Sequence, residues 1–322
     1  MAQISYCRES VPMPEKRSIL QSIFISEDEP RLRAGWRLIL HALLVLVTSI
    51  VIGIVWSSLV IAIDVSLPSL NLAQGLGVNE VAVSALEVIA ITIATWIARR
   101  YLDHRSFRSL GLGIDRSTWS DLVAGFLLSA FLFLILYLTT TILGWSQFIS
   151  WAWENENLGQ VLLRVTASFL VFVGAAFQEE LLSRGYQLQN LAQGTNLPLA
   201  VFLSSLIFSL LHLGNPNVSW MAVVGLLAAG FFLAYAYLRT KSLWLPIGIH
   251  LGWNFFEGTV FGFPVSGTSP FSLIQQQSGG PELLSGGMFG PEAGLIVLPV
   301  LLLGAWLVKL YTKRNDSLAA SA

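Results

Sequence analysis

Two adjacent carboxylates, Glu179 and Glu180, end a run of uncharged residues in an apolar part of the chain. A charge at the centre of a bilayer costs about 2.5–3.5 kcal/mol on insertion scales, so acids in such a segment need a partner or a function. Neighbouring residues of a helix differ by about 100° in direction, so these two side chains diverge. Glu180 precedes Arg184 by four residues, which is the favourable order for a helical ion pair. We therefore pair Glu180 with Arg184 and leave Glu179 free for chemistry; the alternative is two solvated acids at a helix end.

Two histidines and an asparagine lie in other apolar segments. His212 comes at the end of one segment, whereas His250 and Asn254 are four residues apart in another and share a helical face. A single histidine inside a membrane is weak evidence of function. A carboxylate pair, two imidazoles and an amide on three segments are stronger evidence, because away from water only one another can stabilise them. The pattern predicts one polar site assembled from three helices.

The elements that position these side chains are predicted to be membrane helices. Of the 322 residues, 54% are hydrophobic and only 11% are charged, whereas soluble domains carry about 25% charged residues. Eight apolar segments have close to the ~20 residues that a helix needs to cross ~30 Å of hydrocarbon, and a helix satisfies its own backbone groups in lipid. The predicted fold class is therefore all-α, a polytopic membrane helix bundle of about eight transmembrane helices. The segments are Trp36–Asp64, Val78–Ala98, Trp119–Trp145, Val161–Gln187, Leu197–Leu213, Val218–Leu238, Ser242–Val260 and Glu292–Tyr311.

The basic residues predict the orientation of this bundle. If the eight segments alternate in direction, every Lys and Arg except Arg164 falls on the same side, which the positive-inside rule places in the cytosol together with both termini. We predict an integral multi-pass membrane protein with a cytosolic tail at 1–34, a transmembrane domain at 35–315 and a C-terminal tail at 316–322. The residues on the basic side are Arg8, Lys16, Arg17, Arg31, Arg33, Arg37, Arg99, Arg100, Arg105, Arg108, Arg116, Arg184, Arg239, Lys241, Lys309, Lys313 and Arg314.

Composition also excludes some kinds of protein. The net charge of −1 argues against electrostatic binding of nucleic acid. Cys7 is the single cysteine, so an intrachain disulfide and a cysteine-based metal cluster are both excluded. The connection at 261–290 is rich in Gly, Ser and Pro and longer than most, which indicates a lid, a binding loop or a disordered segment.

The predicted boundaries place the candidate residues at different depths. Glu179 falls in the cytosolic half of its segment, whereas His212 falls near the opposite end of its own. For the two to meet, either the first segment continues as a helix through Gln187–Gln193, or the segment at 197–213 is displaced outward or broken.

The chain carries three ordered motifs that resemble those of the CAAX prenyl protease and bacteriocin-processing family of intramembrane proteases (CPBP or Abi family). The motifs are Glu179-Glu180-x-x-x-Arg184, Phe208-x-x-x-His212 and His250-x-x-x-Asn254. The resemblance covers residues 161–260, which form a CPBP-like core of the transmembrane domain, and each motif position is present.

The resemblance implies hydrolysis of a peptide bond. Glu179, helped by His212, is expected to activate a water, which is general-base work of about 10²–10⁴-fold. His250 and Asn254 are expected to donate hydrogen bonds to the developing oxyanion, and the ion pair of the first motif to orient the site. Because a site within the bilayer must admit water, we also expect a polar cavity that opens toward the cytosol.

The role of a metal stays open at this point. Glu179, His212 and His250 form a His₂Glu set like that of known zinc hydrolases, but the compact His-Glu-x-x-His motif is absent. A metal-free, glutamate-dependent hydrolase needs the same residue types, and we favour that reading over zinc.

The sequence thus predicts an intramembrane endopeptidase that acts on a membrane-associated protein or peptide, with prenylated CAAX-type proteins among the candidate substrates. One alternative is a proton-coupled transporter, in which the same residues relay protons, although no inverted repeat of the kind common in transporters is seen. The other is a catalytically silent family member that acts as an immunity or scaffold protein.

Overall fold

The computed structural model describes residues 23–26, 29, 31–66 and 78–320. Most of the predicted tail at 1–34, including Cys7, Arg8, Lys16 and Arg17, lies outside the described residues, as does the side chain of Arg314.

All eight predicted segments are helical. The long helices are α2 (Ala34–Ser66), α3 (Val78–Ile97), α4 (Thr118–Ile142), α6 (Leu158–Glu180), α8 (Leu197–Leu211), α9 (Trp220–Thr240), α10 (Trp244–Asn254) and α12 (Val297–Ala320). Three helices continue into a π-helical turn: η2 (Ala98–Leu102), η4 (Leu181–Gln187) and η6 (Phe255–Val260). The shorter helices are η3 (Phe107–Leu110), α5 (Ala152–Asn155), α7 (Leu188–Gly194), η5 (His212–Gly214), α11 (Glu282–Ser285), η7 (Gly287–Phe289) and η8 (Pro291–Ala293).

The chain is a helical membrane bundle, and six stretches of its described part are long and apolar enough to cross a bilayer. They are Ala34–Asp64, Asn79–Leu102, Thr118–Ile142, Leu158–Gly194, Leu197–Gly214 and Trp220–Thr240. The predicted count of eight spans is not reached by this measure. Helix α10 has only 11 residues, most of them buried against other helices, so it contributes to the core more than to the lipid-facing surface. Helix α12 begins at Val297, and Glu292, the predicted start of the last span, lies before it in η8.

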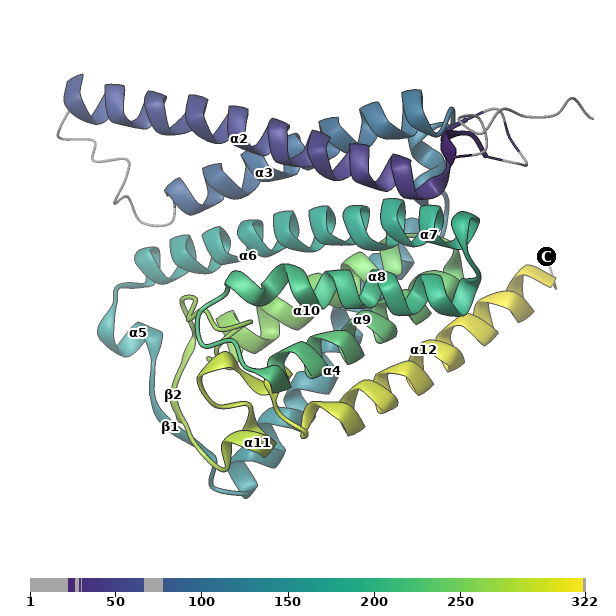
Figure 1. Ribbon diagram of the computed structural model, residues 1–322. Helices are drawn as coiled ribbons and strands as arrows, with labels where there is room; N and C mark the ends of the chain where they lie inside the picture. Colours follow the sequence, from purple (N-terminus) through teal and green to yellow (C-terminus); the bar gives the residue numbers. More distant parts are fainter. Residues whose placement is uncertain (1–22, 27–28, 30, 67–77, 321–322) are drawn as a thin grey trace, which may run out of the picture.

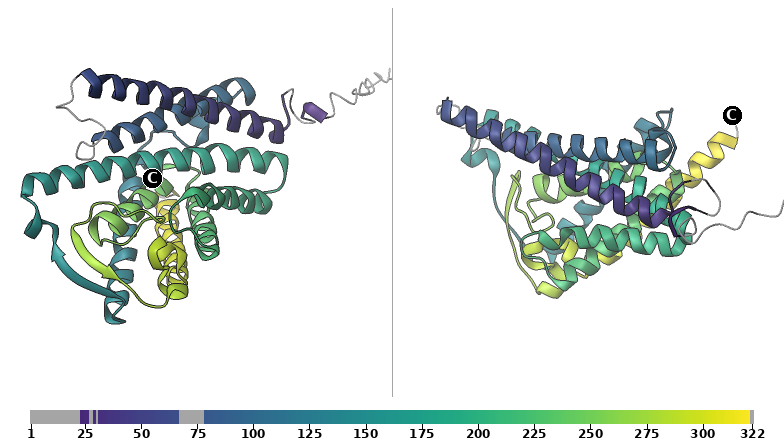
Figure 2. Two further views of the ribbon diagram at one scale, coloured as in Figure 1. Left: turned by 60° about the vertical axis from the view of Figure 1, so that its left-hand side comes forward. Right: turned by 45° about the horizontal axis from the view of Figure 1, so that its top comes forward.

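The bundle has two unequal parts, which Figures 1 and 2 show from different sides. Helices α2 and α3 pack on each other and form an outer layer, and α3 packs on α6. Beyond α6 lies the main bundle, in which α10 packs against α4, α6 and α9, and α12 packs against α4 and α9. Helix α10, with two candidate site residues, is therefore surrounded by other helices.

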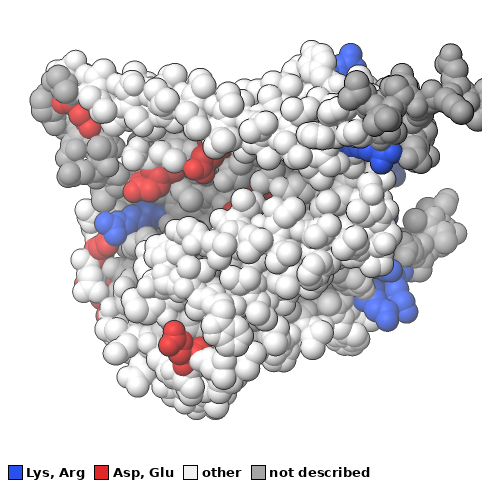
Figure 3. Space-filling model, viewed as in Figure 1, with Lys and Arg blue, Asp and Glu red and all other residues white. Residues whose placement is uncertain are grey.

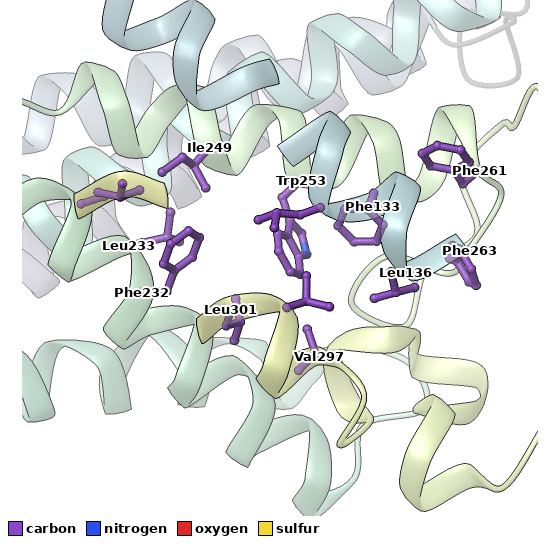
Figure 4. Close-up of a cluster of buried hydrophobic side chains, with 14 of the residues drawn as sticks. Phe133, Leu136, Phe232, Leu233, Ile249, Trp253, Phe261, Phe263, Val297 and Leu301 are labelled. Carbon is purple, nitrogen blue, oxygen red and sulfur yellow. The ribbon is translucent and has the colours of Figure 1, made fainter. Parts of the chain in front are cut away.

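The contact between α4 and α10 depends on glycine. A Cβ atom on Gly125 would lie 2.6 Å from a backbone atom of α10, and one on Gly248 would overlap the backbone of α4. Small residues that let helix backbones approach closely are typical of membrane helix pairs. Around this contact, side chains of four helices form the main hydrophobic cluster, with Trp253 of α10 against Phe133 of α4 at a ring-centroid distance of 4.6 Å (Figure 4).

The connection between α4 and α6 and the connection after η6 meet in a short sheet. β1 (Ser146–Trp151) pairs antiparallel with β2 (Ile274–Ser278), with an irregularity between Phe148 and Ser150. Neither strand was expected from the sequence. The connection at 261–290 is an ordered segment that contains β2, α11 and η7, so of its three predicted forms the disordered one is wrong.

Charged residues divide between the two ends of the bundle. On the face shown in Figure 3, most Lys and Arg side chains gather at the end where α12 ends, and Asp and Glu lie toward the end with β1 and β2. Arg164, the predicted exception, pairs with Glu156 at 3.1 Å. Arg184 was counted with the basic side, but its side chain is only 1% exposed inside the bundle, so it is no part of a cytosolic loop.

Candidate active site

One long helical stretch carries the first motif to the centre of the bundle. Helix α6 begins after Asn157, whose side chain accepts a hydrogen bond from the backbone N–H of Gln160 and caps the helix. The chain then stays helical through η4 and α7 as far as Gly194, a stretch of 37 residues. Glu179 therefore lies in the interior of the span. Of the two predicted ways to bring it to the depth of His212, helical continuation through Gln187–Gln193 is the one observed.

A π-helical turn directly follows the motif's two carboxylates. Regular α-helix ends at Glu180, and η4 extends from Leu181 to Gln187. Such turns interrupt the regular hydrogen-bond ladder and are frequent at functional sites. Here the turn contains Arg184, the basic member of the motif.

The predicted ion pair between Glu180 and Arg184 is present and fully buried. Arg184 Nη1 donates to Glu180 Oε1 at 2.7 Å, with side-chain exposures of 1% and 0%. The guanidinium also donates to the Gly230 carbonyl at 3.1 Å, and it lies 4.5 Å from the ring centroid of Phe208. His250 Nδ1 is 2.9 Å from the same Glu180 oxygen. Glu180 thus connects the α6 motif to α10.

Glu179 points away from this pair, as the helical geometry predicts, and faces both histidines. Its Oε2 lies 3.7 Å from His212 Nε2 and 3.8 Å from His250 Nε2. Its side chain is 29% exposed, compared with 15% for His212 and 8% for His250. Glu179 is therefore the more accessible of the two carboxylates.

His212 is held in one orientation by the end of α8. Its Nδ1 lies 2.9 Å from the carbonyl oxygen of Phe208, one turn earlier. Because a carbonyl only accepts hydrogen bonds, Nδ1 is the donor, and Nε2 is the ring nitrogen that faces Glu179.

The candidate residues share one cavity of about 140 Å³. Glu179, His212, His250 and Asn254 all line it, so the structure brings the predicted set together, while Glu180 and Arg184 lie behind it. Other lining residues come from the connections after α8 and after η6, namely Asn215, Val265, Ser266, Thr268 and Glu292. These connections lie at the end of the bundle opposite the basic residues. The lining of the cavity thus extends toward the end opposite the basic residues, and the expected opening toward the cytosol stays a prediction.

The three possible zinc ligands do not form a recognised metal arrangement. Within the described residues, no group of three or more His, Cys, Asp or Glu side chains has the geometry of a metal site. Zinc bound at 2.0–2.2 Å would bring its ligand atoms to roughly 3.4 Å from one another, whereas Glu179 Oε2 is 3.7 and 3.8 Å from the two Nε2 atoms. A zinc site would therefore need these three side chains to move closer together by a few tenths of an ångström, and the choice between a zinc-dependent and a metal-free mechanism stays a prediction.

Two buried acids were missed by sequence reasoning. Glu257 is completely buried in η6, and Glu292 in η8 is 6% exposed at the cavity. A signal for the first was available, because Glu257 follows His250 by seven residues and Asn254 by three, which places all three on one helical face. Glu292 ends the stretch 286–292, which resembles bacterial members of the same family, but its place at the edge of an apolar run did not mark it as a residue of the site.

Comparison with known proteins finds a family model that matches the part of the chain that holds this site. Residues 160–256 match the family described as Rce1-like, type II CAAX prenyl endopeptidase Rce1-like. The chain is 27% identical over 223 residues to the "Putative membrane peptidase YdiL" of Bacillus subtilis (strain 168), covering 67% of this chain and 82% of that relative. It is 26% identical over 167 residues to the "Uncharacterized protein YyaK" of the same strain, covering 50% and 54% of the two chains. No solved structure matches the chain. The resemblance predicted from the three motifs is confirmed at the level of the family, and all motif residues lie inside the matched segment.

Proposed function

We propose, from the membership of residues 160–256 in the Rce1-like family of CAAX prenyl endopeptidases, that this membrane protein hydrolyses a peptide bond within the bilayer. The substrate is a membrane-associated protein or peptide. The observation that carries the proposal is the position of Glu179 Oε2, less than 4 Å from the Nε2 atoms of His212 and His250 at the wall of a cavity.

Glu179 is the general base in this proposal. A water with two hydrogen bonds of about 2.8 Å bridges atoms about 4.5 Å apart, so the gaps of 3.7 and 3.8 Å between Glu179 Oε2 and the imidazoles admit one after the side chains move apart by less than about 1 Å. A water there donates one hydrogen to Glu179 and the other to the lone pair of His212 Nε2, which leaves its own lone pairs for the scissile carbonyl carbon. Glu179 takes the proton as the C–O bond forms and returns it to the leaving amine as the C–N bond breaks.

His250 and Asn254 stabilise the oxyanion. The Asn254 amide donates without a change of charge. The Glu180 carboxylate accepts from Arg184 and from His250 Nδ1, so His250 donates from Nε2 only when its ring is doubly protonated. The net charge of the site is then close to zero, because the two carboxylates of Glu179 and Glu180 are balanced by Arg184 and the imidazolium. Each oxyanion donor contributes about 10²–10³-fold to such reactions.

The direction of the cavity sets where the substrate enters. Its outer lining comes from the connections that carry Asn215, Ser266 and Glu292, and the basic residues lie at the other end of the bundle (Figure 3). With both termini in the cytosol, which the positive-inside rule supports, the scissile bond reaches Glu179 from the non-cytosolic half of the membrane.

The test compares purified variants in proteoliposomes against a library of fluorogenic peptides, half of them farnesylated at a C-terminal CAAX-type motif. Glu179→Gln and His212→Ala are expected to lose about 10²–10⁴-fold in kcat, while Glu154→Gln, an exposed acid on α5, retains wild-type cleavage. Equal cleavage by Glu179→Gln and wild type would refute the mechanism. If no peptide is cleaved and Glu179→Gln instead abolishes proton flux into the liposomes, the transporter reading replaces it.

The same cleavage assay tests whether the activity depends on zinc. The water-based mechanism expects cleavage to survive preincubation with 1,10-phenanthroline followed by gel filtration. Loss of cleavage with the chelator, restored by added Zn²⁺ but not by Mg²⁺, would instead make Glu179, His212 and His250 metal ligands.

A further inference from the structure

The cavity has a second acidic wall, formed by Glu292 of η8. Its side chain is 6% exposed and lines the same cavity as Glu179 and His212. Glu292 Oε2 accepts hydrogen bonds from the backbone N–H of Ser266 at 3.0 Å and from its hydroxyl at 2.6 Å. Within the described part of the chain, Glu292 forms no ion pair with a Lys, Arg or His.

Glu257 lies behind this wall with no partner for its carboxylate. It is 0% exposed, and among the described residues neither of its two oxygens has a hydrogen-bond partner. Its Oε1 would lie 3.5 Å from a Cβ atom on Gly290, two residues before Glu292, and the two acids are close enough for their charges to interact. A buried carboxylate without a partner is unfavourable by several kcal/mol. Glu292 accepts two hydrogen bonds from Ser266 but has no counter-ion among the described residues, so a positive charge in the cavity would be favoured beside it.

The acidic wall is held rigidly. A Cβ atom on Gly225 of α9 would overlap the carbonyl oxygen of Glu292, so the glycine allows η8 to press directly against that helix. Ser266 has a positive φ of 45°, a conformation that a non-glycine residue adopts only when its surroundings hold it there. Its two hydrogen bonds to Glu292 supply that constraint. A charged group fixed by backbone and packing in this way is pre-organised to bind a ligand.

We propose that Glu292, with Glu257 behind it, forms a subsite for a positively charged group of the substrate, a lysine or arginine side chain or a free α-amino group. The proposal rests on the proposed function, because the same cavity holds the general base. Its volume of about 140 Å³ is close to that of an engineered cavity of about 150 Å³ that binds benzene, so it admits one side chain or chain end. The preferred substrate is then an extended segment with a basic residue near the scissile bond.

The test measures binding, so that it does not depend on cleavage. The probes are twelve-residue leucine–alanine peptides that carry one lysine, or one norleucine of similar length, at each position in turn. Their Kd values are measured by fluorescence anisotropy on the full chain in nanodiscs with the Glu179→Gln substitution. In at least one position lysine is expected to bind about tenfold more tightly than norleucine. Equal binding of the two peptides at every position would overturn the proposal without any further variant.

Substitutions in the acidic wall then test whether Glu292 causes the preference for lysine over norleucine. Adding Glu292→Gln is expected to bring the lysine-to-norleucine ratio to about one, while Glu292→Asp restores part of it and Glu282→Gln, an exposed acid on α11, leaves it unchanged. Glu257→Gln, measured separately, is expected to leave the ratio close to the parent value, because burial without a counter-ion favours the uncharged form of this carboxyl. An unchanged ratio in Glu292→Gln, in a sample that elutes and melts like the parent, would also overturn the proposal. A lysine preference that persists although Glu179→Gln cleaves like wild type would refute the catalytic mechanism and leave the subsite standing.

Discussion

Replacing Arg184 with methionine should destabilise the protein by about 3–5 kcal/mol, because it removes the guanidinium that balances the buried charge of Glu180 and leaves only the hydrogen bond with His250. The burial of the ion pair decides whether this value or the much smaller one of an exposed pair applies. An exposed ion pair contributes only about 0–1 kcal/mol, but the exposures of Arg184 and Glu180 are 1% and 0% and their charged atoms lie 2.7 Å apart. Methionine has a similar length and fills the space beside Phe208, so the loss of packing is small.

The double variant Glu180→Gln with Arg184→Met separates charge from packing. It removes both buried charges, so most of the lost stability should return, as it does when buried pairs are replaced together. Cleavage should not return with it, because His250 loses the carboxylate that accepts from its Nδ1 at 2.9 Å. Restored stability without activity is the result expected of a pair that orients the site.

Equilibrium unfolding in mixed micelles of rising SDS fraction measures this directly, with fluorescence of the 11 tryptophans as the signal. Wild type, each single variant and the double variant complete a double-mutant cycle. The reasoning is refuted if Arg184→Met unfolds at the wild-type SDS fraction, or if the double variant is no more stable than Arg184→Met.

Gly248→Ala should destabilise the protein by roughly 1–3 kcal/mol, because the added methyl group meets the backbone of α4. The matched control is Gly53→Ala, whose added Cβ has nothing within 4 Å. This control should unfold at or slightly above the wild-type SDS fraction. The orientation of the bundle predicts that, in a Cys7→Ser background, Met288→Cys reacts with a membrane-impermeant maleimide in intact bacterial cells, because Met288 is 73% exposed at the end with β1 and β2. Lys313→Cys, at the opposite end, should react only after the membrane is permeabilised; the reverse pattern would place both termini outside the cytosol.

The membrane fold and the membership of each motif in a helix were predictable from the sequence. The scarcity of charge and the length of the apolar segments can be read from the sequence alone, because they do not depend on which helices are neighbours. The pairing of Glu180 with Arg184 and the common face of His250 and Asn254 follow from helical periodicity alone, because residues four apart lie one turn from each other.

The depth of Glu179 was not predictable in the same way. Hydropathy ended its segment near Gln187, because Gln189, Asn190 and Gln193 are polar and read as a loop. In the structure these amides are held by charged groups from distant parts of the chain: Gln189 accepts from Arg99 at 2.8 Å, and Gln193 accepts from Arg31 at 2.9 Å. Polar residues that form hydrogen bonds with partners far away in the chain can remain part of a buried helix. The mean hydropathy of one segment contains no information about those partners.

The sequence by itself therefore determined which side chains share a helix and a face, since that is local geometry. Only the tertiary structure decided that Glu179 faces His212 and His250, that the cavity extends away from the basic end, and that Glu292 lies on its wall. These arrangements depend on close helix approach at glycines such as Gly225 and Gly248. Contacts of that kind involve residues far apart in the chain, and the spacing within any one segment does not encode them.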